Sequence, residues 1–273
     1  MPPKLGIIAG QGELPGRLID ACRLSGRDFF VVAIEGQADP EAVAGTSHIW
    51  SRLGAAGTAF AKLREAAVQE VVMAGAVHRP SLSALRPDLR TAKFLARLAR
   101  SALGDDGLLS AVVREFEEAG FRVIGPDEIL DQMVTAAKLN GRIEPDAQAA
   151  ADIAVGIDVA RALGRLDVGQ AVVVQQGVVL GVEAIEGTDA LIARCSELRR
   201  EGTGGVLIKL KKPGQERRVD LPTIGARTVA AAAAAGLRGI AVEAGGSLIV
   251  DPPAVAAIAD ETGLFILGIE VAE

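Results

Sequence analysis

The sequence predicts an α/β protein of two domains: an N-terminal Rossmann-like domain with a parallel sheet (residues 1–132) and a second α/β domain with a mixed sheet (residues 133–273). In the first third, short apolar runs that end in glycine alternate with helical patterns, which is typical of βαβ units with right-handed crossovers. Around residues 125–150 this alternation weakens, and glycines and prolines accumulate. Two β-rich runs then flank Gln176-Gly177, which is the pattern of a hairpin.

The elements of the first domain follow from apolar runs and their spacing. Residues 4–9 form a short apolar run closed by Gly10, which predicts a buried strand entering a tight turn. Residues 14–24 have apolar positions at helical spacing, and Gly26 stops the pattern. We expect further strands at 29–34, 47–51, 70–74 and 121–124, and further helices at 55–68, 88–102 and 107–119.

The second domain begins with a helix over about residues 146–163. Its hairpin pairs a strand at 171–174 with one at 178–184. We then expect a helix from about 189, a strand at 205–209, an alanine-rich helix at 226–236 and a final strand-helix-strand unit that ends over 264–271.

The composition excludes several classes of function. The net charge of −6, from 29 basic and 35 acidic residues, argues against general electrostatic binding of nucleic acid. Aromatic residues make up only 3%, so platforms for stacking bases are few. Two Cys and two His rule out a Cys/His zinc cage within one chain, because the cage would need all four together. The phosphate-binding pattern GxxxxGK[ST] and the nucleophile pattern GxSxG are also absent.

The sequence predicts a cytoplasmic protein. The N-terminal apolar run is too short for a signal-peptide core, and the uncharged stretch at residues 228–237 is too short to span a bilayer. Contact with a membrane surface remains open, because it needs no spanning segment. Cys22 and Cys195 form no CxxC pattern, and we expect two reduced thiols in the core.

Two glycine-containing turns in the first domain are candidate binding sites. Gly10 and Gly12 follow the first strand, where the backbone can approach a phosphate and the next helix offers free N–H groups. A structural turn is the alternative, and NAD binding is disfavoured because Pro15 stands where the dinucleotide fingerprint has its third glycine. His78 and Arg79 follow the strand at 70–74, at the edge where open α/β sheets bind ligands. They could hold a phosphate or a sugar hydroxyl, or lie in an ordinary turn.

The second domain contains a cluster of acidic residues around Thr188. Glu183 and Glu186 end a strand, Thr188 is a good helix N-cap, and Asp189 falls in the first helical turn. An Asp in the first turn stabilises a helix through its interaction with the helix dipole, without any ligand. A functional reading gives Thr188 a phosphate contact and Glu183 or Glu186 a divalent ion. The two readings are evenly matched.

Five cations lie within residues 209–218, beginning with the last residue of the strand at 205–209, and Asp220 follows them. Such a run is usually a solvated loop. However, a Lys/Arg cluster, a carboxylate and the following helix N-terminus are together the parts needed to bind a polyphosphate and a hard metal ion.

The segments GIIAGQGELP, GAVHRP, LDVGQAVVV, VEAIEGTDALI and KLKKPGQERRVDLPTIG occur in this order from Leu5 to about Gly268. In that combination the chain resembles the UDP-2,3-diacylglucosamine pyrophosphatases of lipid A biosynthesis in Gram-negative bacteria, in the branch unrelated to the calcineurin-like phosphoesterases. EGTD and DLPTIG are the most specific segments. The resemblance implies metal-dependent cleavage of the substrate diphosphate, which gives UMP and 2,3-diacylglucosamine 1-phosphate (lipid X).

The resemblance also implies roles for individual residues. Asp220 of DLPTIG would be the catalytic, metal-linked carboxylate. From the acidic cluster around Thr188 we also expect Asp189 and Glu183 to bind the ion, which would be Mg²⁺ or Mn²⁺. Two positions depart from the family pattern, where Pro often follows IG and Asp follows KPGQ: here they are Ala226 and Glu216. The expected substrate contacts are Gly10, Gly12, His78, Arg79, Gln170, Thr188, Lys209, Arg217, Thr223 and Gly225.

We therefore expect a hydrolase whose two domains enclose a lipid-linked nucleotide sugar, with water as the nucleophile and an apolar pocket for two acyl chains. Its partners would be UDP-2,3-diacylglucosamine and lipid X, a second copy in a homodimer, and transiently the inner-membrane surface, but no nucleic acid. The alternatives are a non-catalytic nucleotide-sugar-binding or regulatory module, and a nucleotide-dependent oxidoreductase that rests only on Gly10, Gly12 and Glu35.

Overall fold

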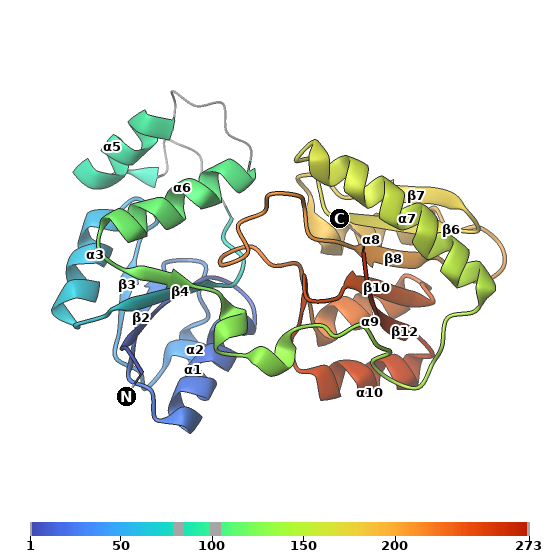
Figure 1. The fold of residues 1–273 in the computed structure, drawn as a ribbon, viewed down its shortest axis with the longest axis horizontal. Coiled ribbons are helices and arrows are strands. Elements are labelled where there is room, and N and C mark those ends of the chain that lie inside the picture. Colours follow the sequence, from blue (N-terminus) through green and yellow to red (C-terminus); the bar gives the residue numbers. More distant parts are fainter. Residues whose placement is uncertain (1, 79–84, 99–104, 272–273) are drawn as a thin grey trace. The chain divides into compact units, whose positions relative to one another are not determined.

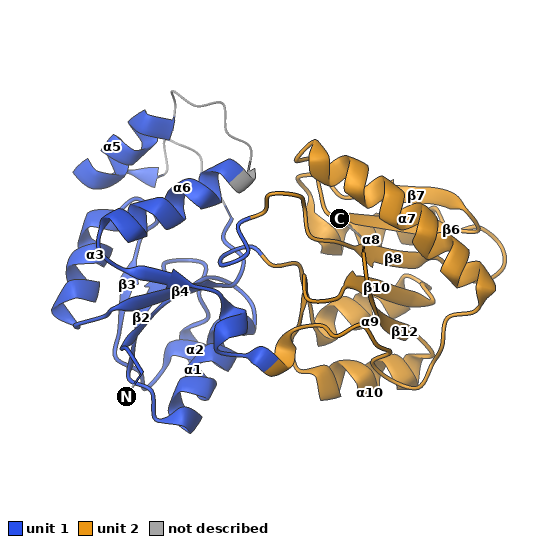
Figure 2. Ribbon diagram, viewed as in Figure 1, with its two compact units in different colours: residues 1–131, 216–220 blue, residues 132–215, 221–273 orange. Residues whose placement is uncertain are grey.

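A computed structural model describes residues 2–78, 85–98 and 105–271. The chain forms two compact units (Figure 2). The first unit comprises Met1–Asp131 together with Glu216–Asp220, and the second comprises Gln132–Gln215 and Leu221–Glu273. The second half of the sequence thus contributes a short segment to the first unit, which the sequence analysis did not anticipate.

The first unit contains a parallel five-stranded sheet in the order β3-β2-β1-β4-β5 (Figure 1). This is the strand order of a doubly wound nucleotide-binding sheet without its sixth strand. The predicted α/β class with a parallel first sheet is confirmed. The strands are β1 (Leu5–Ala9), β2 (Phe29–Ile34), β3 (His48–Ser51), β4 (Glu70–Ala74) and β5 (Arg122–Ile124).

Helices connect these strands, and one core cluster packs Phe60 and Leu63 of one helix against Val32, Val71 and Phe121. The apolar spacing that predicted the first helix is realised in α1, which ends at Gly26 with φ 66°, a left-handed value that glycine adopts without strain. The helices are α1 (Leu14–Ser25), α2 (Pro40–Val43), α3 (Ala56–Glu65), α5 (Leu89–Leu98) and α6 (Asp105–Glu118), followed by the 3-10 turns η1 (Pro126–Glu128) and η2 (Asp131–Met133).

The second unit contains a mixed five-stranded sheet in the order β12-β10-β8-β6-β7, so the predicted mixed sheet is also confirmed. Its parallel strands are β8 (Val206–Lys209), β10 (Gly239–Glu243) and β12 (Phe265–Ile269). The predicted hairpin consists of β6 (Ala171–Gln175) and β7 (Val178–Val182), and β6 is antiparallel to both β7 and β8. A separate two-stranded sheet, β9 (Thr223–Ile224) with β11 (Leu248–Ile249), was not predicted.

Helices cover both faces of this second sheet (Figure 1). Val206 and Ile208 of β8 pack toward α7 (Ala147–Arg165), whereas Leu207 between them packs toward the other face. This alternation explains why the strand is apolar throughout. The helices α8 (Gly187–Glu197), α9 (Ala226–Ala234) and α10 (Pro252–Thr262) supply the apolar side chains on that other face.

Both cysteines are free and buried, which confirms the predicted core thiols. Most element boundaries lie within three residues of the predicted ones. The prediction of Thr188 as the helix N-cap is wrong, because α8 begins at Gly187 and Glu186 occupies the N-cap, so the threonine lies inside the first turn. None of the helices in the described ranges combines the length and apolarity that crossing a bilayer requires.

Candidate active-site residues

The two glycine motifs of the first unit meet at the carboxyl edge of its sheet. Gln11 and Ala76 exchange two backbone hydrogen bonds, of 2.8 and 3.1 Å. A Cβ on Gly10 would lie 2.6 Å from the Ala76 carbonyl oxygen, and one on Gly75 would lie 2.3 Å from the Gln11 carbonyl oxygen. Both glycines are therefore needed for this close backbone crossing between the turns after β1 and β4. Gly12 lies beside it with φ 92°, and a Cβ there would have open space.

Gln37, after β2, fixes the backbone of His78. Its Nε2 donates to the His78 carbonyl oxygen (3.1 Å), and its Oε1 accepts from the His78 N–H (3.2 Å). His78 itself is exposed, so its ring is accessible at this sheet edge. The sequence analysis did not identify Gln37, because nothing in the sequence links residue 37 to residue 78. Arg79, predicted as a substrate contact, lies outside the described residues.

Asp220 lies in the segment Glu216–Asp220, which we call the strap and which belongs to the first unit. Asp220 is half-buried, and its N–H donates to the Glu216 carbonyl oxygen at 3.1 Å. Arg217 of the strap, predicted as a substrate contact, forms an ion pair with Asp127 at 3.1 Å. Most of the other predicted residues from the second half of the sequence lie in the second unit.

Glu183 joins two predicted substrate contacts of the second unit. Its Oε1 accepts from the Thr188 hydroxyl at 2.6 Å, and its Oε2 accepts from the Gln170 N–H at 3.0 Å. The Gln170 side chain in turn accepts from Gln215 Nε2 at 3.3 Å. Glu183 and Gln215 are buried, and we call these four residues the Glu183 network. The network joins the LDVGQ, EGTD and KPGQ segments, which are far apart in the sequence.

Close approach of the backbone makes the network geometry possible. Gly169 precedes Gln170, and a Cβ on Gly169 would lie 2.1 Å from the Glu183 carbonyl oxygen. The Glu183 N–H donates to the Ala171 carbonyl oxygen at 2.8 Å, which continues the β6–β7 pairing. The sequence analysis did not recognise Gln215 as part of the site, although KPGQ contributed to the resemblance.

Lys209 ends β8 at the carboxyl edge of the second sheet. The lysine is buried, and its Nζ donates to the Thr223 carbonyl oxygen at 3.2 Å. The Thr223 hydroxyl donates to the Leu221 carbonyl oxygen at 2.9 Å, which shapes the turn after the strap. Gly225 is the N-cap of α9, and its carbonyl accepts from the Val229 N–H. The structure therefore brings Lys209 and Thr223 together.

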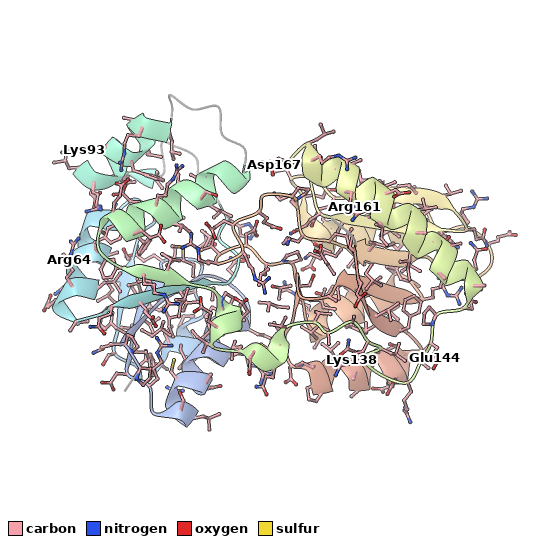
Figure 3. The ribbon with its side chains drawn as sticks, viewed as in Figure 1. Arg64, Lys93, Lys138, Glu144, Arg161 and Asp167 are labelled. Carbon is pink, nitrogen blue, oxygen red and sulfur yellow. The ribbon has the colours of Figure 1, made fainter. Side chains whose placement is uncertain are left out.

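The predicted run of cations is divided among separate carboxylates. Lys211 lies 4.0 Å from Glu243, and its backbone N–H donates to the same carboxylate at 2.9 Å. Lys212 is buried and pairs at 2.6 Å with Asp167, which follows the C-terminal end of α7 (Figure 3). Carboxylates distant in sequence therefore pair with Lys211 and Lys212, so the run is not a single positive patch.

The remaining predicted metal ligands also have protein partners. Asp189 is exposed and pairs with Arg227 at 3.0 Å, and both oxygens of Glu183 accept hydrogen bonds in the Glu183 network. Over the described ranges, no group of three or more His, Cys, Asp and Glu side chains could hold a metal ion.

A cavity of about 950 Å³ lies in the first unit between α3, α5 and α6. Its wall includes Asp88, Arg90 and Glu115. Lys93 of α5, marked in Figure 3, also lines it. None of the predicted site residues that the structure describes belongs to this wall, so the cavity is separate from the positions discussed above.

Both halves of the chain match models of known protein domains. The family model described as LpxI N-terminal domain matches residues 4–133, and the model described as LpxI C-terminal domain matches residues 136–267. The chain is 46% identical over 279 residues to the UDP-2,3-diacylglucosamine pyrophosphatase LpxI of Caulobacter vibrioides, and the match covers 99% of both proteins.

Among solved structures, the Bordetella bronchiseptica enzyme WbmG in complex with NAD and UDP is 18% identical, with a TM-score of 0.31. That match covers 44% of this chain and 36% of the other, and at this TM-score it supports no argument about fold or ligands. The two family models together span nearly the whole sequence and agree with the order of segments that suggested the resemblance. The chain belongs to the LpxI family of UDP-2,3-diacylglucosamine pyrophosphatases.

Proposed function

We propose that this chain hydrolyses the diphosphate of UDP-2,3-diacylglucosamine to UMP and lipid X, as a step of lipid A biosynthesis. The observation that supports this most strongly is the 46% identity, over 99% of both chains, with a pyrophosphatase of that name. The β-sheet edges described above are consistent with it, because open α/β sheets bind ligands at the carboxyl ends of their strands.

The chemistry requires positioning and charge neutralisation more than covalent catalysis. Water is the proposed nucleophile, and Asp220 is the proposed catalytic carboxylate. Lys209 is buried at the end of β8, where an ammonium group stabilises negative charge on phosphate oxygens more strongly than it would in bulk water. Gly10, Gly12 and His78 remain proposed contacts to the substrate from the first unit.

Our proposal includes Mg²⁺ or Mn²⁺ as cofactor, with Asp220 as its ligand. Mg²⁺ commonly takes one or two protein carboxylates and completes its coordination with substrate phosphate oxygens and water, so a half-buried aspartate fits this use. When bound, the ion would neutralise charge on the diphosphate. Asp189 pairs with Arg227 and Glu183 accepts two hydrogen bonds, so an ion at either carboxylate would compete with these partners.

The test is release of UMP from UDP-2,3-diacylglucosamine by the purified chain in Mg²⁺, Mn²⁺ or EDTA. Asp220→Asn should reduce kcat on the order of 10³-fold with the fold intact, as expected when a group acts mainly in the transition state. Asp158→Asn, which changes an exposed carboxylate on α7, serves as the matched control and should leave the rate unchanged. The proposal fails if neither cation supports UMP release. Thermal stabilisation by UDP-sugars without UMP release would instead favour a binding module.

We also propose that the protein works in the cytoplasm as a homodimer, contacts the inner-membrane surface transiently and binds no nucleic acid. Its lipid substrate is the reason for the membrane contact. Light scattering coupled to gel filtration measures the dimer, and co-sedimentation with anionic phospholipid vesicles measures the contact. A monomer at working concentration, or no vesicle binding at low salt, would contradict the respective statement.

A further inference from the structure

Ion pairs attach the strap to the first unit. Residues on both sides of it in the sequence, Gln215 and Leu221, belong to the second unit. The apolar residue of the strap, Val219, is only half-buried. Arg217 and Arg218 both form side-chain hydrogen bonds to the rest of the first unit.

Arg217 contacts the 3-10 turn η1 through Asp127. Its Nε and Nη2 donate to Asp127 Oδ2 at 3.2 and 3.1 Å. The Asp127 side chain is only 15% exposed, so removal of the Arg217 guanidinium would leave a poorly hydrated carboxylate without its cation. A Cβ on Gly125 would lie 2.1 Å from Asp127 Oδ1, so the missing side chain at Gly125 leaves room for the carboxylate.

Arg218 makes a second attachment, to helix α6. Its Nη1 donates to Glu117 at 2.6 Å. Its Nε and Nη2 donate to the two oxygens of Glu216 within the strap, both at 2.8 Å. This two-pronged bond is the strong form of an arginine–carboxylate pair. It lowers the pKa of the Glu216 carboxyl, chiefly through the hydrogen bonds from Arg218.

The backbone of the strap connects these attachments to Asp220. The N–H groups of Val219 and Asp220 both donate to the Glu216 carbonyl oxygen at 3.1 Å, which closes a single helical turn. Glu216 therefore fixes the turn through its carbonyl and fixes Arg218 through its carboxylate. Displacement of Arg217 and Arg218 would displace Asp220 with them, because all these residues belong to one turn.

We propose that Asp127 and Glu117 are positioning residues for Asp220: through Arg217 and Arg218 they fix the turn that presents the catalytic carboxylate. This inference rests on the role of Asp220 in the proposed function. It assigns Arg217 to this task and not to direct contact with the diphosphate. Neither acidic residue needs to touch the substrate, so their loss affects the rate through the geometry of Asp220.

Swapping the charges of Asp127 and Arg217 distinguishes a positioning role of Arg217 from direct binding of the substrate. Asp127→Asn and Arg217→Asp should each lower kcat about tenfold or more, since small misplacement of a reacting group can cost as much as 10²-fold. KM should change less than threefold. The double variant Asp127→Arg with Arg217→Asp restores the pair with its polarity reversed and should recover most of kcat. If Arg217 binds the diphosphate directly, the double variant stays as slow as Arg217→Asp, which overturns the proposal.

A readout independent of activity is hydrogen exchange at the Val219 and Asp220 amides. Exchange should accelerate at least tenfold in Asp127→Asn and Glu117→Gln, because the turn opens more often. Glu118→Gln is the matched control: this neighbour of Glu117 pairs with Arg97 instead and should leave both exchange and kcat unchanged. Unchanged exchange in Asp127→Asn would also refute the proposal. If Asp220→Asn retains its rate, the proposed function fails instead, whatever the exchange data show.

Discussion

Replacing Glu183 with glutamine tests whether this buried carboxylate organises the Glu183 network. Glutamine keeps one acceptor oxygen for the Gln170 N–H, while its NH₂ group faces the Thr188 hydroxyl, which must then accept a hydrogen bond instead of donating one. Both hydrogen bonds lose their charged acceptor, and because a charged acceptor makes a hydrogen bond roughly twice as strong, each bond is weakened by about 1.5 kcal/mol. The total of about 3 kcal/mol corresponds to a fall in Tm of roughly 6–12 °C for the second unit.

Thermal unfolding followed by circular dichroism measures this change alongside UMP release. Glu186→Gln is the matched control at the same strand end, since its pair with Arg194 is solvent-exposed and should contribute little to stability. Thr188→Val should show an intermediate loss because it removes only one of the two bonds. A Glu183→Gln protein with unchanged Tm, reduced Mn²⁺ affinity and no activity would refute the structural role and make Glu183 a metal ligand.

Three further predictions concern Asp152, the two cysteines and Glu216. Asp152 accepts hydrogen bonds from two N–H groups of the β6–β7 turn, at 3.0 and 2.7 Å. Asp152→Ala should therefore lower the free energy of unfolding in urea by about 2–4 kcal/mol. A loss below about 1 kcal/mol would contradict this role. Burial raises the pKa of both Cys22 and Cys195, so a thiol reagent at pH 8 should label them only after denaturation; labelling of the native protein within minutes would contradict the buried assignment. The pKa of Glu216 is lowered in the folded protein, so its carboxylate stabilises the fold fully above the unfolded-state pKa, and this contribution is lost as the pH falls through the folded-state pKa. The Tm difference between wild type and Glu216→Gln should therefore be present at pH 7 and narrow below about pH 4.5. A Tm difference that does not depend on pH would exclude the ionised carboxylate as its source.

Most of the fold could be predicted from local patterns. Apolar runs closed by Gly10 and Gly75 and the stop at Gly26 located the strands and the first helix of the first unit within a few residues. The short sheet of β9 and β11 was missed because each strand has only two residues, which is too short for an alternating pattern. Thr188 was misassigned as an N-cap because its hydroxyl donates to Glu183, a partner that the local pattern does not reveal, and Glu186 holds the N-cap position.

The candidate site was harder to predict because its chemistry depends on partners distant in sequence. Arg217, Lys212 and Lys211 read as one cationic run, yet their carboxylates lie 90, 45 and 32 residues away. Charge patterning along a chain records neighbours in sequence, whereas neutralisation depends on neighbours in space. The strap's place in the first unit also depends on neighbours in space, because the residues before and after it in the sequence belong to the second unit.

The motifs that revealed the family therefore combine two kinds of residue that a pattern cannot separate. EGTD, LDVGQ and KPGQ meet in the Glu183 network, where Glu183 and Gln215 are buried and bond to other motif residues. Membership in a motif consequently does not identify a substrate contact. A residue that orients its neighbours needs its particular side chain as much as a residue that touches the diphosphate does. Stability and rate distinguish them, because loss of a network residue lowers Tm as well as kcat, whereas loss of a group that acts only in the transition state lowers kcat alone.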